Sequence, residues 1–263
     1  MIVRQAQLAI AKQLEPIAGE DATLEATFLL RANGYHSPYQ TLSETDAALL
    51  NEQIKRRLTG EPLQYVLGEW EFYGLPITVN PSVLIPRPET ELLVEEALKR
   101  LDESHRDVLD LCCGSGCIGI ALAACGGANV TAADISADAL ELTERNARRN
   151  GVKLQTVQSD FLDDVTGMFD LIVCNPPYLS QAEMDARDES LRFEPALALF
   201  GGSDGLEFYR RLAKDYKRIL RQGGTLLFEI GMTQKEAVQA LFPNADCIED
   251  YGNRPRVMVV YHA

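Results

Sequence analysis

Two hydrophobic periods alternate from residue 106 to the C-terminus, and this alternation constrains the fold more than any other feature. Short apolar runs, typical of buried strands, are separated by segments with helical spacing. The expected strands are DVLDL, NVTAAD, LQTVQ, DLIVC, TLLFEI and RVMVVY, and the expected helices are GCIGIALAA and residues 137–150, 206–220 and 233–241. This pattern predicts an α/β fold, in which a mostly parallel sheet carries helices on both faces and binds ligands at the carboxyl ends of its strands.

Residues 1–60 differ from the rest of the chain and predict three helices. The first covers residues 2–14, and the second begins after a cap at Asp21 and ends near Asn33. The third begins after a cap at Ser43 and ends at Gly60. Its expected apolar face consists of Leu49, Leu50, Ile54 and Leu58.

The stretch WEFYGLPITV predicts a β-hairpin with its turn at Gly74-Leu75. The paired side chains would be Trp70 and Phe72 on one strand, and Ile77 and Val79 on the other. A proline-rich linker, NPSVLIPRPETE, follows the hairpin. The expected organisation is therefore a helical domain over 1–60, a hairpin and linker over 61–88, and a large α/β domain over 89–263.

The net charge of −14 argues against a broad phosphate-binding surface, because nonspecific affinity for nucleic acids comes mostly from Lys and Arg. The first residues mix Arg4 and Lys12 with apolar residues, unlike the apolar core of a signal peptide. No apolar run approaches the length of a membrane span. We therefore expect a cytoplasmic protein that contacts no membrane and binds no nucleic acid directly, although a local basic patch stays open, and whose six cysteines are reduced thiols. We also expect a monomer.

The stretch VLDLCCGSGCIG places Gly114, Gly116 and Gly119 between a strand and a helix. Glycine lets a backbone approach a ligand closely, and Asp134 closes the next strand, where a carboxylate can accept from ribose hydroxyls. These features alone match a dinucleotide fingerprint. A nicotinamide-dependent dehydrogenase therefore stays open as an alternative, as does a tight turn with a capping aspartate.

Two further strand ends favour a different ligand. Asp110 lies at the end of the first strand, where it could accept from an ammonium group, and a pyrophosphate would be repelled there. Asp160 and Phe161 follow the third strand and offer an acceptor for an exocyclic amine and a face for a purine. With Asp134, these residues suit a ligand that carries an ammonium, a ribose and an adenine but no phosphate. S-adenosylmethionine fits that description.

A metal site is not expected, although Cys113 and Cys117 lie close in sequence. Zinc sites show paired close spacings or nearby histidines, and the histidines of this chain, His36, His105 and His262, are scattered. Small buried thiols that pack between strand ends explain the cysteines better.

The run FDLIVC leads directly into the tetrad Asn175, Pro176, Pro177 and Tyr178. Two prolines stop the strand, because each fixes φ and removes a backbone donor. An amide or amino NH2 group has two donors, which the Asn175 side-chain oxygen and the Pro176 carbonyl could each accept. Pro177 would stiffen the row, and Tyr178 could lie against a flat substrate. Such orientation suits methyl transfer to a weakly nucleophilic nitrogen.

With these motifs in place, the chain resembles the release factor glutamine methyltransferases, the PrmC/HemK family. NPPY, DLCCGSG and AAD resemble the wider class of amino-methyltransferases. The narrower resemblance is carried by EPLQYVLGEWEFYGLPITVNPSVLIPRPETELLVE, RFEPALALFGGSDGL and DYGNRPRVMV. It implies a class I S-adenosylmethionine-dependent methyltransferase domain with a Rossmann-like seven-stranded sheet, preceded by a small helical substrate-recognition domain and a linking β-hairpin.

The same resemblance implies an enzyme that methylates the side-chain amide of the glutamine in the Gly-Gly-Gln motif of class 1 peptide chain release factors. Methylation of a ribosomal-protein glutamine or of adenine N6 in a nucleic acid stays open as an alternative. The implied cofactor loop is Cys112, Cys113, Gly114, Ser115 and Gly116, with Asp134 at the ribose, Phe161 at the adenine, and Asn175 to Tyr178 at the substrate. The loop begins Cys-Cys where the family often has Gly-Thr, and cysteine lacks the freedom of glycine at positive φ.

Residues 180–205 form a long connection, and long connections are often functional. Arg192 to Pro195 could wall the substrate pocket or form a structural salt link with a packed phenylalanine. Arg87 and Glu91 could likewise lie at the cofactor entrance or support the start of a helix.

Overall fold

The computed structural model describes residues 1–262, which fall into two compact units. The helical unit comprises Met1–Glu69 and Asp188–Phe193, and the sheet unit comprises Trp70–Arg187 and Glu194–Ala263. The helical unit therefore extends beyond the expected boundary at residue 60 and includes a short segment from the expected long connection. Among the described residues, no helix is both long and apolar enough to cross a membrane.

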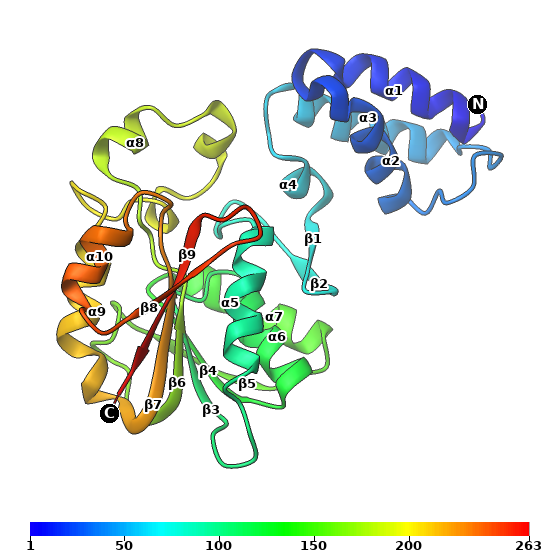
Figure 1. Ribbon diagram of the computed structural model, residues 1–263. Helices are drawn as coiled ribbons and strands as arrows, with labels where there is room; N and C mark the ends of the chain where they lie inside the picture. Colours follow the sequence, from blue (N-terminus) through cyan, green and yellow to red (C-terminus); the bar gives the residue numbers. More distant parts are fainter. Residues whose placement is uncertain (263) are drawn as a thin grey trace. The chain divides into compact units, whose positions relative to one another are not determined.

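The helical unit contains four helices, one more than expected. They are α1 (Val3–Ala18), α2 (Ala22–Ala32), α3 (Glu44–Leu58) and α4 (Leu63–Leu67), drawn in blue to cyan in Figure 1. The side chain of Ser43 accepts from the Asp46 N–H, which confirms the cap of α3. The side chain of Asp21 makes no such bond, and a 3₁₀ turn, Gly19–Asp21, leads into α2 instead.

The apolar face predicted for α3 is only half right. Leu50 and Ile54 are buried in the core of the unit, whereas 51% of Leu49 and 42% of Leu58 are exposed. Leu49 lies next to Leu50 in sequence, so it points about 100° away around the helix. The core instead receives apolar residues from α1, α2 and the unpredicted α4.

The hairpin consists of β1 (Glu69–Phe72) and β2 (Leu75–Thr78), joined at Tyr73-Gly74. Both turn residues have positive φ, 53° and 73°, which matches the twist of a tight hairpin. The expected turn was one residue too late, because Tyr73 adopts a conformation that a tyrosine rarely takes. The Asn146 carboxamide accepts from Thr78 N at 2.8 Å and donates to Thr78 O at 3.0 Å, which holds β2 against helix α7 (Ala137–Arg149).

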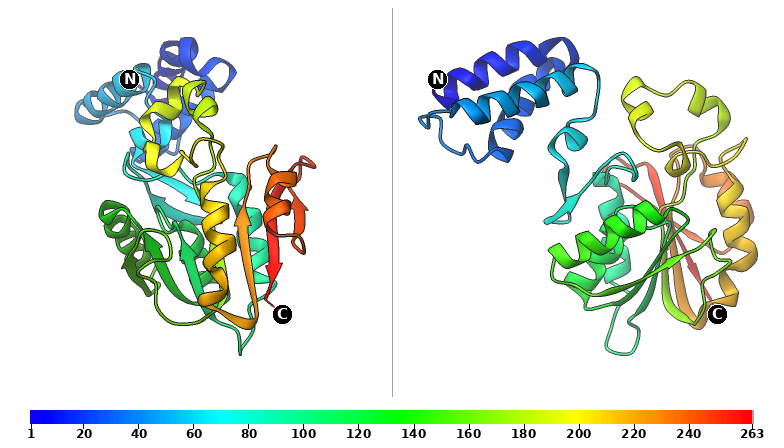
Figure 2. Two further views of the ribbon diagram at one scale, coloured as in Figure 1. Left: turned by 90° about the vertical axis from the view of Figure 1, so that its left-hand side faces the viewer. Right: turned by 180° about the vertical axis from the view of Figure 1, so that it is seen from behind.

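Seven strands form the sheet, in the order β5-β4-β3-β6-β7-β9-β8. Neighbours from β5 to β7 run parallel, and β9 is antiparallel to both β7 and β8 (Figure 2). The strands are β3 (Asp107–Leu111), β4 (Asn129–Asp134), β5 (Leu154–Gln158), β6 (Phe169–Cys174), β7 (Leu220–Glu229), β8 (Asp246–Glu249) and β9 (Pro255–Tyr261). The mostly parallel sheet is confirmed, and β8 is the strand that the sequence pattern did not indicate.

Helices cover both faces of the sheet (Figure 2). One face carries α5 (Glu91–Leu98), α6 (Cys117–Gly126) and α7 (Ala137–Arg149), and the other carries α9 (Glu207–Asp215) and α10 (Lys235–Leu241). Two expectations need correction. The predicted linker ends in a 3₁₀ turn, Pro88–Thr90, that opens α5, and the predicted helix over 206–220 stops at Asp215 because β7 already begins at Leu220.

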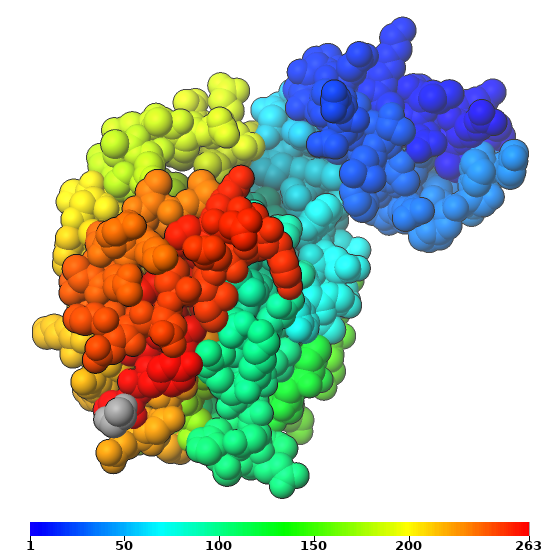
Figure 3. All heavy atoms as spheres, in the orientation of Figure 1, coloured from blue at the N-terminus to red at the C-terminus, as the bar shows by residue number. Residues whose placement is uncertain are grey.

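The loop between β8 and β9 lies against α5, as the adjoining red and teal surfaces of Figure 3 show. The Tyr251 hydroxyl donates to the Glu95 carboxylate at 3.1 Å. The C-terminal strands thereby help to hold α5, the helix that follows the Pro88–Thr90 turn.

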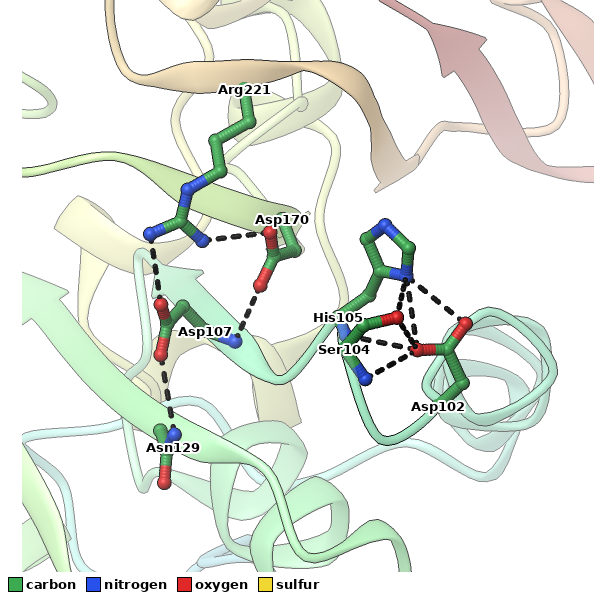
Figure 4. Close-up of polar contacts among 7 residues, drawn as sticks. All are labelled: Asp102, Ser104, His105, Asp107, Asn129, Asp170 and Arg221. Carbon is green, nitrogen blue, oxygen red and sulfur yellow. Dashed lines mark hydrogen bonds and ion pairs between the residues drawn. The ribbon is translucent and has the colours of Figure 1, made fainter.

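At the amino ends of the strands, Arg221 of β7 joins two carboxylates (Figure 4). Its Nη2 lies 2.9 Å from Asp107 Oδ2 on β3, and its Nη1 lies 2.7 Å from Asp170 Oδ1 on β6. Asp170 also accepts from Asp107 N at 2.9 Å, and only 7% of its side chain is exposed. The Arg221 hydrogen bond is the main reason why the pKa of Asp107 lies below its usual range.

We predict that Arg221→Gln lowers the free energy of unfolding by about 1–3 kcal/mol near neutral pH, because it leaves the buried Asp170 without its charged partner. Urea unfolding measures this loss. A carboxyl whose folded pKa is depressed stabilises the fold above its unfolded pKa, so the loss should shrink as the pH falls through the acid range. Arg148→Gln is the control, because Arg148 and Glu144 form an exposed pair, which contributes at most about 1 kcal/mol. Equal effects of both variants would contradict the prediction.

Candidate active site

A cavity of about 270 Å³ lies at the carboxyl ends of β3, β4, β5 and β6. β3 is flanked by β4 on one side and β6 on the other, so the direction of the chain through the sheet reverses here. Such a switch point is where open α/β sheets bind ligands. The predicted site residues that line the cavity are Cys112, Cys113, Gly114, Ser115, Asp134, Asp160, Phe161, Asn175 and Pro177.

Glycine is required at the end of the loop after β3 and again in the first turn of the helix that follows it, α6 (Cys117–Gly126). Gly116 has a φ of 77°, and a Cβ there would lie 2.7 Å from Thr143 Cγ2. A Cβ at Gly119 would lie 2.8 Å from Asp110 Oδ2 and 2.9 Å from Val130 Cγ1. The close packing of α6 against the sheet therefore depends on Gly119, and the approach of the loop to α7 depends on Gly116. Gly116 itself is not a lining residue of the cavity.

Cys112 opens the loop in the conformation that the sequence made doubtful for a cysteine. Its φ is 58°, in the left-handed region that residues with a Cβ rarely occupy. The loop is held against the end of β4, because Cys113 N donates to Ala133 O at 3.1 Å and Gly114 N donates to Asp134 Oδ2 at 2.9 Å. These bonds hold a conformation that cysteine alone would not prefer.

Asp134, the last residue of β4, links two loops. One carboxylate oxygen accepts from Gly114 N and the other from Ser136 N, both at 2.9 Å. Burial is the main reason why the pKa of Asp134 is raised, and these backbone N–H groups oppose the shift. Each oxygen still has a lone pair that can accept from a ligand in the cavity.

Asp110 does not line the cavity, in contrast to the expectation that it meets an ammonium group directly. It is fully buried beneath the glycine loop, where its Oδ2 accepts from Gly119 N at 2.8 Å. Its Oδ1 has no hydrogen-bond partner among the described residues. Burial raises the pKa of Asp110 to about 7, and the charge of Asp134 adds to this shift. Asp110 therefore lies beneath the glycine loop, where it binds the first turn of α6 through Gly119 N.

Asp160 and Phe161 lie at the end of β5, and α9 contributes to their environment. Arg211 Nη1 lies 2.7 Å from Asp160 Oδ1, and its guanidinium carbon lies 5.0 Å from the centre of the Phe161 ring. Phe161 has a φ of 60°, another rare conformation at the cavity. The sequence did not indicate Arg211 or Phe208, whose ring lies 5.5 Å from that of Phe161, because both belong to a distant helix.

The tetrad after β6 is only partly directed into this cavity. Asn175 and Pro177 line it, whereas Pro176 and Tyr178 do not. Tyr178 O accepts from Gln234 Nε2 at 2.9 Å, and burial raises the pKa of the Tyr178 hydroxyl to about 12. The tetrad therefore has an anchored backbone and keeps its phenol protonated at neutral pH.

The long connection over residues 180–205 has two roles. Glu194 holds the segment that contains Ile85 and Arg87, and Pro195 forms part of the cavity wall. Glu194 accepts from Ile85 N at 3.0 Å and forms an ion pair with Arg87, which is the structural salt link considered above. Pro195 and Arg87 line the cavity. Phe193 belongs to the helical unit, where its ring lies near Gly60.

Glu91 supports the hairpin and does not line the cavity, because its Oε1 accepts from Tyr73 N at 2.8 Å. Thr90, next to it in sequence, is a cavity residue that sequence reasoning missed. Its only signal was its place within RPETE.

The cysteines are free thiols throughout residues 1–262. Within that range, no group of three or more His, Cys, Asp or Glu side chains is arranged to hold a metal ion.

Comparison with known proteins places the chain in a family. Residues 5–68 match the family described as the PrmC N-terminal domain, and residues 88–192 match the methyltransferase small domain. The chain is 36% identical to the release factor glutamine methyltransferase of Agrobacterium fabrum, over 95% of this chain and 94% of that protein. The enzyme of that name from Koribacter versatilis is 38% identical, over 98% of both chains. This chain belongs to the release factor glutamine methyltransferase family.

Solved structures agree on the fold of this methyltransferase. A Pyrococcus furiosus methyltransferase superimposes with a TM-score of 0.58 at 16% identity, over 84% of this chain and 100% of that one. The Thermus thermophilus 16S rRNA methyltransferase RsmC, in complex with AdoMet and guanosine, gives a TM-score of 0.54 at 22% identity, over 74% and 50%. These likenesses, with the order of the seven strands, confirm the expected class I methyltransferase fold.

The raised pKa of Asp110 predicts a pH-dependent stability. The unfolded carboxyl, with an ordinary pKa of 3.8, ionises first, and the folded one keeps its proton until about pH 7. The free energy of unfolding should therefore fall as the pH rises between these values. From about pH 5 to about pH 8, Asp110→Asn should gain about 2–3 kcal/mol relative to the unsubstituted protein.

Urea unfolding at both pH values measures this gain. Asp246→Asn, at an exposed position on β8, is the control and should show a difference that does not vary with pH. If Asp110→Asn behaves like that control, the buried carboxyl does not titrate as stated.

Proposed function

We propose that this methyltransferase transfers a methyl group from S-adenosylmethionine to the side-chain amide nitrogen of the glutamine in the Gly-Gly-Gln motif of class 1 release factors. The observation that supports this most strongly is identity to release factor glutamine methyltransferases over nearly the whole chain. The tetrad Asn175–Tyr178 at the end of β6, beside the glycine loop, supplies the matching chemistry.

The cavity fits S-adenosylmethionine by its donor set. Asp134 has oxygens available for ribose hydroxyls, and Phe161 and Asp160 offer an aromatic face and an acceptor for adenine. The backbone of Cys112, Cys113, Gly114 and Ser115 would border the ligand, as would Asn175, while Gly116 would shape the loop behind them. Asp110 has one buried oxygen without a partner below the loop, and ionisation of this carboxyl, whose pKa is about 7, would favour a cationic ligand.

When bound, S-adenosylmethionine supplies an electrophilic methyl group. Asn175 Oδ1 and the Pro176 carbonyl would accept the two N–H bonds of the substrate amide and turn its lone pair toward that methyl group. Pro176 and Pro177 make this row stiff, so little orientation is lost at the moment of reaction. The extra proton on the alkylated amide nitrogen is very acidic and would leave to water.

We further propose that the helical unit recognises the release factor and takes no part in the chemistry. It contains none of the strand-end motifs, and residues 5–68 match a domain found in this family. A release factor is much larger than its glutamine loop, so contacts remote from that loop can contribute binding energy. We expect the enzyme to act as a cytoplasmic monomer that binds no nucleic acid.

The decisive experiment incubates the full-length protein with methyl-labelled S-adenosylmethionine and one of three substrates. These are a class 1 release factor, a ribosomal protein fraction and DNA. Label on the glutamine of the Gly-Gly-Gln motif, absent from a factor carrying Gly-Gly-Ala, supports the proposal. Label on a ribosomal protein or on adenine, with none on the release factor, would overturn it.

We predict that Asn175→Ala lowers kcat on release factor by about 100-fold or more, because it removes an acceptor that orients the reacting amide. The dissociation constant of S-adenosylmethionine should change only modestly. Steady-state kinetics and calorimetry separate the two effects. Asn129→Ala, at the amino end of β4, is the matched control and should retain full turnover. Unimpaired kcat in Asn175→Ala would exclude the assigned role.

We predict that Asp134→Asn weakens S-adenosylmethionine and S-adenosylhomocysteine by similar factors, since both carry the same ribose. The lost charge-assisted hydrogen bonds correspond to about 1.5–3 kcal/mol. Asparagine keeps an oxygen for one of the two backbone N–H groups that Asp134 now binds, so the loop is disturbed less than by alanine. Calorimetry that shows unchanged affinity for both ligands would refute contact with the ribose.

A further inference from the structure

Three polar side chains from distant parts of the chain, two of them buried and Asn175 half-buried, meet at the wall of the cavity. Thr90 precedes α5, Asn175 follows β6 and Glu229 ends β7. Asn175 Nδ2 lies 3.2 Å from Thr90 Oγ1, which in turn lies 2.7 Å from Glu229 Oε2. Thr90 is 2% exposed and Glu229 is 1% exposed, so water does not compete for the bond between them.

The number of available protons fixes the direction of both bonds. A threonine hydroxyl has one proton, and an ionised carboxylate can only accept. The Thr90 proton must therefore point to Glu229, so that only a donor can approach the Thr90 oxygen from the other side. That donor is the NH2 group of Asn175, and Asn175 Oδ1 is then directed away from Thr90.

These hydrogen-bond directions persist only while Glu229 is ionised. The groups around Glu229 set its pKa and therefore its ionisation. Arg256 Nη1 of β9 lies 3.6 Å from Glu229 Oε1, and Tyr178 and Glu89 also face the carboxylate. Burial raises the pKa of Glu229, whereas the Thr90 hydroxyl and the Arg256 charge oppose that shift. A protonated Glu229 could donate to Thr90, which could then donate to the oxygen of Asn175 and reverse the carboxamide.

On the basis of the proposed function, we propose that Thr90 and Glu229 are positioning residues that hold the Asn175 carboxamide with Oδ1 toward the reacting glutamine amide. A reversed carboxamide would present its own NH2 group to the NH2 group of the substrate, where neither can accept. We call the hydrogen-bonded chain Glu229–Thr90–Asn175 the relay. The relay removes that unproductive orientation before the substrate binds, so its contribution should appear in kcat.

The test compares Thr90→Val, which removes the hydroxyl with little change of shape, with Thr90→Ser, which retains it. Thr90→Val should lower kcat on release factor about 10- to 100-fold and leave the dissociation constant of S-adenosylmethionine within about twofold. Thr90→Ser should recover most of the activity. Thr156→Val is the matched control, because it removes an exposed hydrogen bond from Thr156 to Glu144 of the same 2.7 Å length.

Two further readouts separate positioning from a general structural role. In the Asn175→Ala background, Thr90→Val should cause no additional loss, because the relay acts only through Asn175. The acid limb of the kcat profile should be present in the unsubstituted enzyme and absent from Thr90→Val. A full additional loss in the double variant, or Thr90→Val with unimpaired kcat, would overturn the relay.

An NMR measurement on the free enzyme tests the relay without any substrate. The side-chain NH2 signals of Asn175 should exchange slowly with solvent in the unsubstituted protein and in Thr90→Ser, and rapidly in Thr90→Val. Rapid exchange in all three would overturn the relay even if methylation is observed. Slow exchange with no methylation of any release factor would support the relay and refute the proposed function.

Discussion

The parallel pairing of β3 with β4 and β6 is the constraint on which the rest of the sheet unit depends. Leu111 pairs with both Ala133 and Cys174, so the residues that follow these strands emerge side by side. That register brings the glycine loop, Asp134 and Asn175 to one cavity. A shift of one residue in either pairing would direct alternate side chains to the opposite face of the sheet and dismantle the site.

Burial of polar groups gives this cavity its precision. In a low-dielectric interior, a polar group without a partner is costly, and a satisfied network has few alternative arrangements. Thr90, Asn175 and Glu229 form such a network on one side, and Asp134 with its two backbone donors forms another. Asp110 is different, because one of its oxygens stays unpartnered, and burial raises its pKa.

Backbone strain is concentrated at the same cavity. Among the non-glycine residues with positive φ, Cys112 and Phe161 both line it. Rare conformations persist only where the surroundings hold them, and they often occur where a ligand must be contacted. Here the hydrogen bond from Gly114 N to Asp134 stabilises the loop that contains Cys112, and the Phe208 ring and the Arg211 guanidinium pack against Phe161.

The sequence by itself determined the alternating strands and helices, the capping serine Ser43 and the loops that carry the chemistry, because these follow from local periodicity and turn-forming residues. It indicated the cofactor-loop and tetrad residues only as a set of strand ends, without showing that Asp110 lies beneath the loop while Cys112 and Asn175 border the cavity. Tertiary structure alone decided the burial of Leu50 in place of Leu49, the antiparallel β8, and the meeting of Thr90 with Glu229. These features depend on contacts between residues far apart in the chain, and no local pattern encodes such contacts.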